Sequence, residues 1–212
     1  KVGSTHAGLT VGEDGATHQA LEDIAMTRCL PNISVVVPCD AEEARKATIA
    51  AAKTKGPFYL RFGREPLPVI TSEKTPFQVG KALVFKQGKD VSIIACGIMV
   101  AEALKAAEML ENQKIDAMVI NCHTIKPMDT STIVAAAKKT GSVVIAEEHQ
   151  VTGGLGGAVA EVLAEHCPVP MERVGVKDTF GESGKALELL EKYGCTAKEI
   201  VEAVKRVVKR KK

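Results

Sequence analysis

The second half of the chain alternates short apolar segments with longer amphipathic ones. Apolar runs of strand length occur at residues 91–96, 117–121, 143–146 and 173–176. Between them, apolar side chains recur at helical spacing at residues 100–110, 131–139 and 156–166. Strands that are joined through helices run parallel within one sheet, because such a connection is too long for a hairpin. The pattern therefore predicts an α/β domain with a mostly parallel sheet.

This sheet is predicted to have one antiparallel edge. Residues 79–85 and 91–96 flank the turn sequence QGKD and have the composition of a β-hairpin. At the other end of the domain, Thr196 and Glu199 form a capping box, which predicts a last helix that runs to the tail.

The first part of the chain contains a shorter series of the same kind. Apolar spacing predicts a helix over residues 18–28, and strands are expected at residues 33–37 and 58–62. Asp40, with Glu43 three positions later, predicts the start of a helix between those strands that ends near Gly56.

Prolines divide these two parts. Pro66, Pro68 and Pro76 bracket a segment without helical or strand periodicity, so we predict a linker at residues 71–78 between regions 1–70 and 79–212. The first region supplies only two complete strands and a stub at residues 1–4, which is too few for a covered parallel sheet. We therefore expect a segment that precedes residue 1 to complete this domain.

Composition argues against several classes of protein. A net charge of +2 and an aromatic content of 3% give no support for nucleic-acid binding. The longest apolar runs are far shorter than the roughly 20 residues that span a bilayer. The six cysteines have neither CxxC nor zinc-site spacing, and the start of the chain does not resemble a secretory signal. We expect a cytoplasmic protein with buried, reduced thiols.

One glycine-rich segment carries the side chains best suited to chemistry. Between His6 and His18, glycines alternate with polar residues, so that the backbone can approach a ligand while Asp14 and the two histidines accept or donate protons. A helix that begins near His18 would add unpaired N–H groups, which favour anionic ligands such as sugar phosphates. The alternative interpretation is a surface turn at Asp14-Gly15 with Thr17 as a helix cap.

This segment resembles part of a known family. The sequence GEDGATHQ, at residues 12–19, resembles the substrate loop in the pyrimidine-binding domain of transketolase, and is most similar to transketolases divided between two polypeptides. KPMD, AEEH and GGLGGAVAE, further along the chain, match the C-terminal domain of that family. The resemblance covers essentially the whole chain.

The resemblance implies roles for four residues. His18 would be catalytic, in contact with an oxygen of the thiamine-bound intermediate. His6 would contact the sugar near its phosphate, Asp14 would bind a sugar hydroxyl, and Arg64 would bind the phosphate, with Arg61 as a weaker candidate. Ala7-Gly8 stands where larger transketolases have Asp-Ser, which puts the substrate range in doubt.

The resemblance also implies what assists this chain. Thiamine diphosphate and Mg²⁺ would be held mainly by an N-terminal partner subunit and by the segment that precedes residue 1. That segment would also carry the glutamate that activates the cofactor. No cofactor or metal ligand is expected in this chain. The expected reaction is ketol transfer from a ketose phosphate to an aldose phosphate in the pentose phosphate pathway, with the chain inactive alone and oligomeric when assembled.

Other interpretations remain open. One is 1-deoxyxylulose-5-phosphate synthase or a 2-oxoacid dehydrogenase beta subunit, and another is a module that assists assembly without catalysis. The remaining motifs are not expected to be catalytic. The glycines of GGLGG are expected at a closely packed helix start, Glu147 to His149 in an interface or structural role, and His123 and Lys126 at loop and helix-capping positions.

Overall fold

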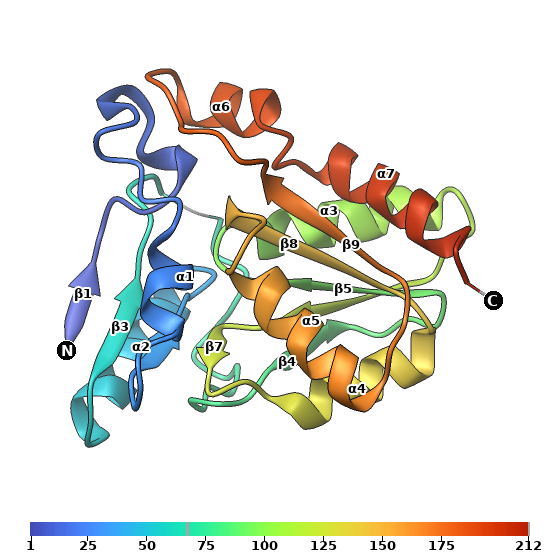
Figure 1. The fold of residues 1–212 in the computed structure, drawn as a ribbon, viewed down its shortest axis with the longest axis horizontal. Helices are drawn as coiled ribbons and strands as arrows, with labels where there is room; N and C mark the ends of the chain where they lie inside the picture. Colours follow the sequence, from blue (N-terminus) through green and yellow to red (C-terminus); the bar gives the residue numbers. More distant parts are fainter. Residues whose placement is uncertain (67, 212) are drawn as a thin grey trace.

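The computed structural model describes residues 1–66 and 68–211 and contains two β-sheets (Figure 1). The strand order is β1-β3-β2-β7 in the first sheet and β4-β6-β5-β8-β9 in the second. The strands are β1 (Val2–Ser4), β2 (Ser34–Val36), β3 (Phe58–Arg61), β4 (Leu83–Lys86), β5 (Val91–Ala95), β6 (Ala117–Asn121), β7 (Thr124–Lys126), β8 (Val143–Gln150) and β9 (Met171–Val176). The helices are η1 (Leu9–Asp14), α1 (Asp23–Arg28), α2 (Ala41–Lys53), α3 (Met99–Glu111), α4 (Thr130–Thr140), α5 (Leu155–His166), α6 (Ala186–Lys192) and α7 (Ala197–Val208), of which η1 is a 3₁₀ helix.

The second sheet confirms the predicted α/β class. Strands β5, β6, β8 and β9 run parallel, and β4 is the antiparallel edge. The predicted hairpin between β4 and β5 is wrong, because β4 pairs with β6, and β5 lies between β6 and β8. All of β5 is buried, as is typical of a parallel strand covered on both faces, whereas β4 is partly exposed and occupies the edge.

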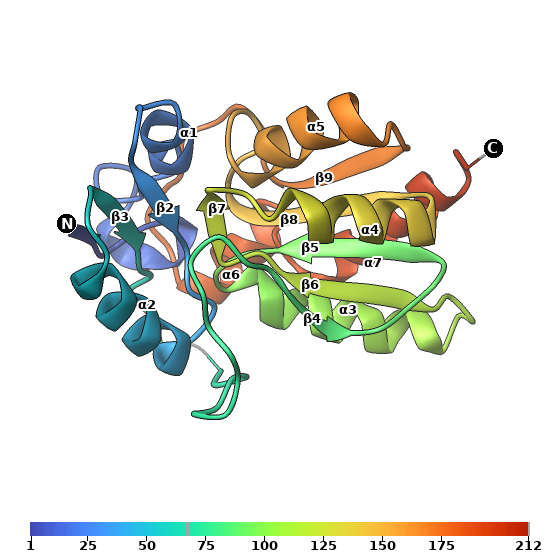
Figure 2. The same ribbon diagram turned by 90° about the horizontal axis from the view of Figure 1, so that it is seen from below.

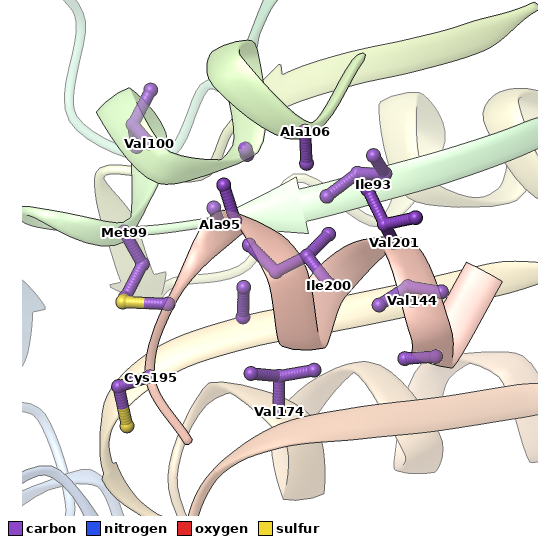
Figure 3. Packing of buried hydrophobic residues seen from close by; sticks show 14 of the residues in the cluster. Ile93, Ala95, Met99, Val100, Ala106, Val144, Val174, Cys195, Ile200 and Val201 are labelled. Carbon is purple, nitrogen blue, oxygen red and sulfur yellow. The ribbon is translucent and has the colours of Figure 1, made fainter. Parts of the chain in front are cut away.

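Helices cover both faces of this sheet (Figure 2). Helices α3 and α7 pack on one face, and α4 and α5 pack on the other. On the first face, Ile200 of α7 belongs to one fully buried cluster with Ile93 and Val144 of the sheet (Figure 3). Thr196 caps α7, as predicted, by accepting a hydrogen bond from the N–H of Glu199.

The first sheet has three parallel strands and one antiparallel strand. Helix α2 packs on one face through Ala47 and Ala51, while Ile24 of α1 packs on the other. As predicted, the Asp40 carboxylate caps α2 by accepting the N–H of Glu43.

The fourth strand of this sheet, β7, comes from the second half of the chain. It pairs antiparallel with β2, with Lys126 opposite Val35 (Figure 2). The predicted loop and capping role of Lys126 is therefore wrong; Asp129 caps the helix that follows. Because β7 pairs with β2, strands from both halves of the chain belong to the first sheet.

The predicted helix over residues 18–28 is wrong in its first part, since α1 begins at Asp23. Ala20 forms a parallel bridge with Ala7, and its carbonyl oxygen accepts a hydrogen bond from the N–H of Gly8. The bridge interrupts helical hydrogen bonding, so the helix starts only after it. The sequence did not predict α6, which packs against η1 (Figure 1).

Four of the six cysteines are buried, Cys167 is half-buried and Cys29 is exposed. Within the described residues, none of the helices has both the length and the apolar character needed to cross a membrane.

Candidate functional site

The candidate site lies at the carboxyl edge of the first sheet. His6 follows β1, and Arg64 follows β3, its parallel neighbour. Ligands bind preferentially at this edge of open α/β sheets, where the loops after adjacent strands meet. The strand arrangement therefore brings residues that are far apart in sequence to the same place.

The loop between β1 and α1 is anchored by its apolar residues. Leu9 and Val11 of η1 are fully buried, whereas Glu13, Asp14 and His18 are exposed. At Gly12 the backbone has φ 79° and ψ −123°, a conformation that L side chains rarely adopt, and η1 is kinked there. The kink lets the first half of η1 point inward while the second half presents polar side chains outward.

Asp14 and Arg64 meet at the tip of this loop. Arg64 Nη1 lies 3.4 Å from Asp14 Oδ2 and donates a 2.7 Å hydrogen bond to the carbonyl oxygen of Val11. The side chains of Arg64 and Asp14 are 37% and 38% exposed, so their ion pair is weak and can exchange for a ligand.

The two histidines are on the same loop but are bonded to their sequence neighbours. His6 Nδ1 lies 2.9 Å from Thr5 Oγ1, and His18 Nδ1 lies 2.9 Å from Thr17 Oγ1. Both side chains are exposed. The structure therefore joins Asp14 to Arg64, and it leaves both imidazole rings accessible without hydrogen bonding them to that pair.

Arg61, the weaker candidate for phosphate binding, is buried beneath the loop. Its Nε donates a 2.8 Å hydrogen bond to Asp23 Oδ2, which also accepts one of 2.8 Å from the Tyr59 hydroxyl. Burial alone would raise the pKa of Asp23, but the charge and hydrogen bond of Arg61 outweigh it and leave the pKa below its usual value. The guanidinium of Arg61 is committed to a buried ion pair and to main-chain carbonyl groups, whereas Arg64 is partly exposed, which agrees with ranking Arg61 as the weaker candidate.

Two residues that sequence reasoning did not assign to the site hold the loop in place. The Gln19 side chain donates hydrogen bonds to the carbonyl oxygens of Leu9, at 3.2 Å, and Glu182, at 2.9 Å. The Glu148 carboxylate accepts a 2.5 Å hydrogen bond from the N–H of Thr10. Both residues lie within the quoted motifs, THQ and AEEH, but a motif alone does not say which residue contacts which.

The remaining conspicuous residues have structural surroundings. Glu147 Oε2 and Oε1 accept the N–H groups of Leu155 and Gly156 at the start of α5, at 2.7 and 2.8 Å, and burial raises the Glu147 pKa to about 7. The ring of His123 stacks on Phe77 with centroids 4.4 Å apart, and burial lowers the His123 pKa to about 4. The GGLGG segment forms the closely packed start of α5.

The first sheet carries the glycine-rich loop, and the second sheet is covered by helices on both faces. Two family models match these two parts of the chain. The transketolase pyrimidine-binding domain matches residues 1–69, and the transketolase C-terminal domain matches residues 80–200. These are domains of thiamine-diphosphate-dependent transferases. The chain belongs to the transketolase family.

Individual relatives agree with this assignment. The 6-deoxy-6-sulfo-D-fructose transketolase subunit of Clostridium sp. (strain MSTE9) is 47% identical over 211 residues, which are 100% of this chain and 66% of that protein. A Methanocaldococcus jannaschii protein named as a transketolase C-terminal section is 42% identical over 213 residues, which are 99% of this chain and 66% of that protein. The chain thus spans just under two thirds of the length of these curated relatives.

A solved structure has the same fold. It is described as a split gene transketolase in an inactive beta4 tetramer, and it superposes with a TM-score of 0.93 at 49% identity. The match covers 99% of this chain and 67% of the other.

Proposed function

We propose that the chain is the C-terminal section of a split transketolase that transfers a two-carbon ketol unit from a ketose phosphate to an aldose phosphate. The main support is the ion pair of Asp14 and Arg64 at the tip of a glycine-rich loop, at the carboxyl edge of a parallel sheet. The carboxylate suits a sugar hydroxyl, and the guanidinium suits a phosphate.

Arg64 binds the phosphate of the sugar. Its bond to the carbonyl oxygen of Val11 fixes one nitrogen, and the planar guanidinium has further N–H groups for a bidentate contact. Phosphate competes with Asp14 for Arg64, so substrate binding separates the ion pair. The carboxylate of Asp14 then accepts a hydrogen bond from a sugar hydroxyl.

The two histidines act on the sugar itself. His18 contacts the oxygen at the reacting carbon, where its imidazole holds or moves a proton during cleavage, and His6 contacts the sugar near its phosphate. An imidazole suits this work because its ordinary pKa lies near neutral pH.

The reaction also needs groups that a partner supplies. Thiamine diphosphate, when bound, supplies the carbanion chemistry that cleaves the bond beside the ketone. The described residues fit the sugar side of such a site better than its metal side: within residues 1–66 and 68–211, no three His, Cys, Asp or Glu side chains are grouped to hold a metal ion. We propose that an N-terminal subunit holds the diphosphate and Mg²⁺ and that the active enzyme is an oligomer of both subunits, supported by the likeness to a split transketolase.

A sulfonated ketose is a second candidate substrate. The relative with 47% identity is named as acting on 6-deoxy-6-sulfo-D-fructose. Sulfonate and phosphate are both oxyanions with a tetrahedral centre, so Arg64 can bind either one. Ala7-Gly8, beside His6, is the departure from larger transketolases that bears on this choice.

The test combines the full gene product with its N-terminal subunit, thiamine diphosphate and Mg²⁺. Each donor, xylulose 5-phosphate, 6-deoxy-6-sulfofructose or pyruvate, is offered with an aldose phosphate acceptor. We expect turnover of xylulose 5-phosphate by the mixture and by neither subunit alone. Turnover of the sulfosugar only would transfer the assignment to the second candidate, and turnover of pyruvate only would indicate a synthase. No turnover with any donor would favour the assembly module.

Asp14 and Glu13 offer a matched pair for testing the site. Both are exposed carboxylates near Arg64, at 3.4 and 3.9 Å, but only Asp14 is proposed to bind sugar. Asp14→Asn should raise KM for the donor about tenfold, because a neutral amide oxygen accepts a weaker hydrogen bond from the sugar hydroxyl than a charged carboxylate does. Glu13→Gln should stay within about twofold of wild type. Equal effects of the two substitutions would count against a specific role for Asp14.

A further inference from the structure

The substrate-side loop is held from the second sheet by a buried carboxylate. Glu148 lies near the end of β8 and is 5% exposed, and its Oε1 accepts the N–H of Thr10 at 2.5 Å. Thr10 is in the first turn of η1, where N–H groups lack partners within the helix. The glutamate therefore supplies, from another part of the chain, the acceptor that η1 does not provide for itself.

Gly8 makes this close approach possible. A β-carbon on Gly8 would overlap the carboxyl group of Glu148, and the Gly8 backbone has φ 86°. Burial raises the pKa of Glu148, but Arg61 and the N–H groups of Thr10 and Leu9 oppose that rise by favouring the charged form. The loop backbone and the arginine thus offset the unfavourable burial of this carboxylate.

A second contact holds the far end of the same loop. The Gln19 side chain joins the carbonyl oxygens of Leu9 and Glu182, and Gly15 packs against Ser183 beside α6. Residues of the second half of the chain therefore hold the first turn of η1 and the backbone just beyond its last residue, while the Asp14 side chain remains exposed.

These contacts lead directly to the proposed substrate site. Thr10, held by Glu148, precedes Val11, whose carbonyl oxygen accepts the hydrogen bond from Arg64. Arg64 in turn pairs with Asp14. A shift of the backbone at Thr10 therefore displaces the attachment point of Arg64 and the start of the turn that carries Asp14.

We propose that Glu148 is a positioning residue for sugar recognition, through which the C-terminal domain sets the geometry of Asp14 and Arg64. The inference rests on the proposed function for its catalytic consequence, but not for the attachment of the loop. Glu148 does not touch the substrate. It acts through the backbone of η1.

The neighbouring Glu147 provides a matched control. It is also a buried carboxylate on β8, and it also accepts N–H groups at the start of a helix, but that helix is α5 and not η1. Glu148→Gln replaces one carboxylate oxygen with an amide that donates, so the contact with the N–H groups of η1 is weakened. Glu147→Gln makes the same chemical change without touching the loop.

The first measurement is hydrogen–deuterium exchange on the isolated chain. Glu148→Gln should speed exchange at residues 9–14 at least tenfold and leave residues 155–163 unchanged, and Glu147→Gln should do the reverse. The second measurement is kinetics of the enzyme assembled with its N-terminal subunit. Glu148→Gln should raise KM for the sugar donor and lower kcat/KM by about 10- to 100-fold, because small misplacements of binding groups are costly. The Kd of thiamine diphosphate should not change, and Glu147→Gln should keep kcat/KM within about twofold.

Gly8→Ala gives an independent variant if Glu148→Gln does not fold. Its added methyl group pushes η1 away from an intact Glu148, so the same rise in KM and in exchange at residues 9–14 is expected. Wild-type exchange at residues 9–14 in both variants, or an unchanged KM in an active assembly, would overturn the proposal. If the wild-type assembly has no activity toward any sugar, the proposed function fails, while the exchange comparison still decides whether Glu148 holds the loop.

Discussion

Replacing Asp23 by asparagine removes one charge from the buried Asp23–Arg61 ion pair beneath the candidate site. The Asp23 and Arg61 side chains are 6% and 5% exposed, and Asp23 Oδ2 accepts hydrogen bonds from both Arg61 and the Tyr59 hydroxyl. Breaking a buried pair by removing one partner costs about 3–5 kcal/mol, because the other charge stays buried without compensation. Arg61 keeps its hydrogen bonds to the carbonyl oxygens of Ala20 and Glu148, so we expect the lower end of that range, about 3 kcal/mol.

Urea denaturation followed by circular dichroism measures this loss. The matched control is Glu161→Gln, which breaks the pair of Glu161 with Arg28 at the surface, where Glu161 is 69% exposed and the loss should stay below about 1 kcal/mol. The deficit should also depend on pH. The Asp23 pKa is lowered in the folded state, so its contribution is present above the ordinary value of 3.8 and is lost as pH falls below it. A loss of unfolding free energy near 1 kcal/mol at pH 7 in Asp23→Asn, or a loss that grows on acidification, would refute the assignment of Arg61 to a structural ion pair.

Three further predictions concern stability. Ile200→Ala should cost about 2–5 kcal/mol in urea denaturation, because Ile200 is fully buried between α7 and the second sheet. Gly141→Ala should cost about 1–2 kcal/mol in the same assay, since Gly141 ends α4 with φ 68°, a strained left-handed conformation for alanine, while the nearest described atom, Cε of Lys211, is at an ordinary 3.9 Å from the added β-carbon. Glu147, with its pKa raised to about 7, should make the wild type lose stability as pH rises from 4.5 to 7. Urea denaturation of both proteins at several pH values should show a steeper loss of stability over that range in wild type than in Glu147→Gln, in which Glu148 still contributes a loss of the same sign.

The sequence predicted those features of the fold that depend on local chemistry. Asp40 and Thr196 were identified as helix caps because a carboxylate or hydroxyl placed three residues before an unpaired N–H reaches it regardless of the rest of the fold. The parallel strands of the second sheet were identified because each contains a mostly apolar run between amphipathic segments. Both signals are contained within a few residues.

The wrong predictions involve partners that are distant in sequence. Local spacing suggested that β4 would pair with β5, but β6 arrives later and takes the position between them. Residues 18–22 have helical apolar spacing, yet Ala20 bridges to Ala7 and so delays the start of α1. Strand β7 has only three residues, and it forms only because it pairs with the edge of β2 that β3 leaves free. In each case a tertiary contact overrides the local preference.

The candidate site shows the same division. A resemblance could identify His6, Asp14, His18 and Arg64 as a set, but only the structure shows that Asp14 and Arg64 form a pair while Arg61 is committed to Asp23. Two arginines three positions apart look equivalent in sequence. They differ because Arg61 ends β3, where its side chain points beneath the loop, whereas Arg64 lies beyond the strand at the surface.

The buried residues that hold the loop of the candidate site, Arg61 and Glu148, come from both halves of the chain. Their position affects which residues of such a protein can change when its substrate changes. The side chains that we propose to contact the sugar are exposed, so their replacement should disturb the fold little. The residues beneath them, Arg61 and Glu148, are buried in contacts that join the two sheets, and changing either leaves a polar group without its partner. Changes of substrate range should therefore concentrate at the exposed tip of the loop. The buried residues are under a different constraint, because they must keep the loop in place whichever ligand it binds.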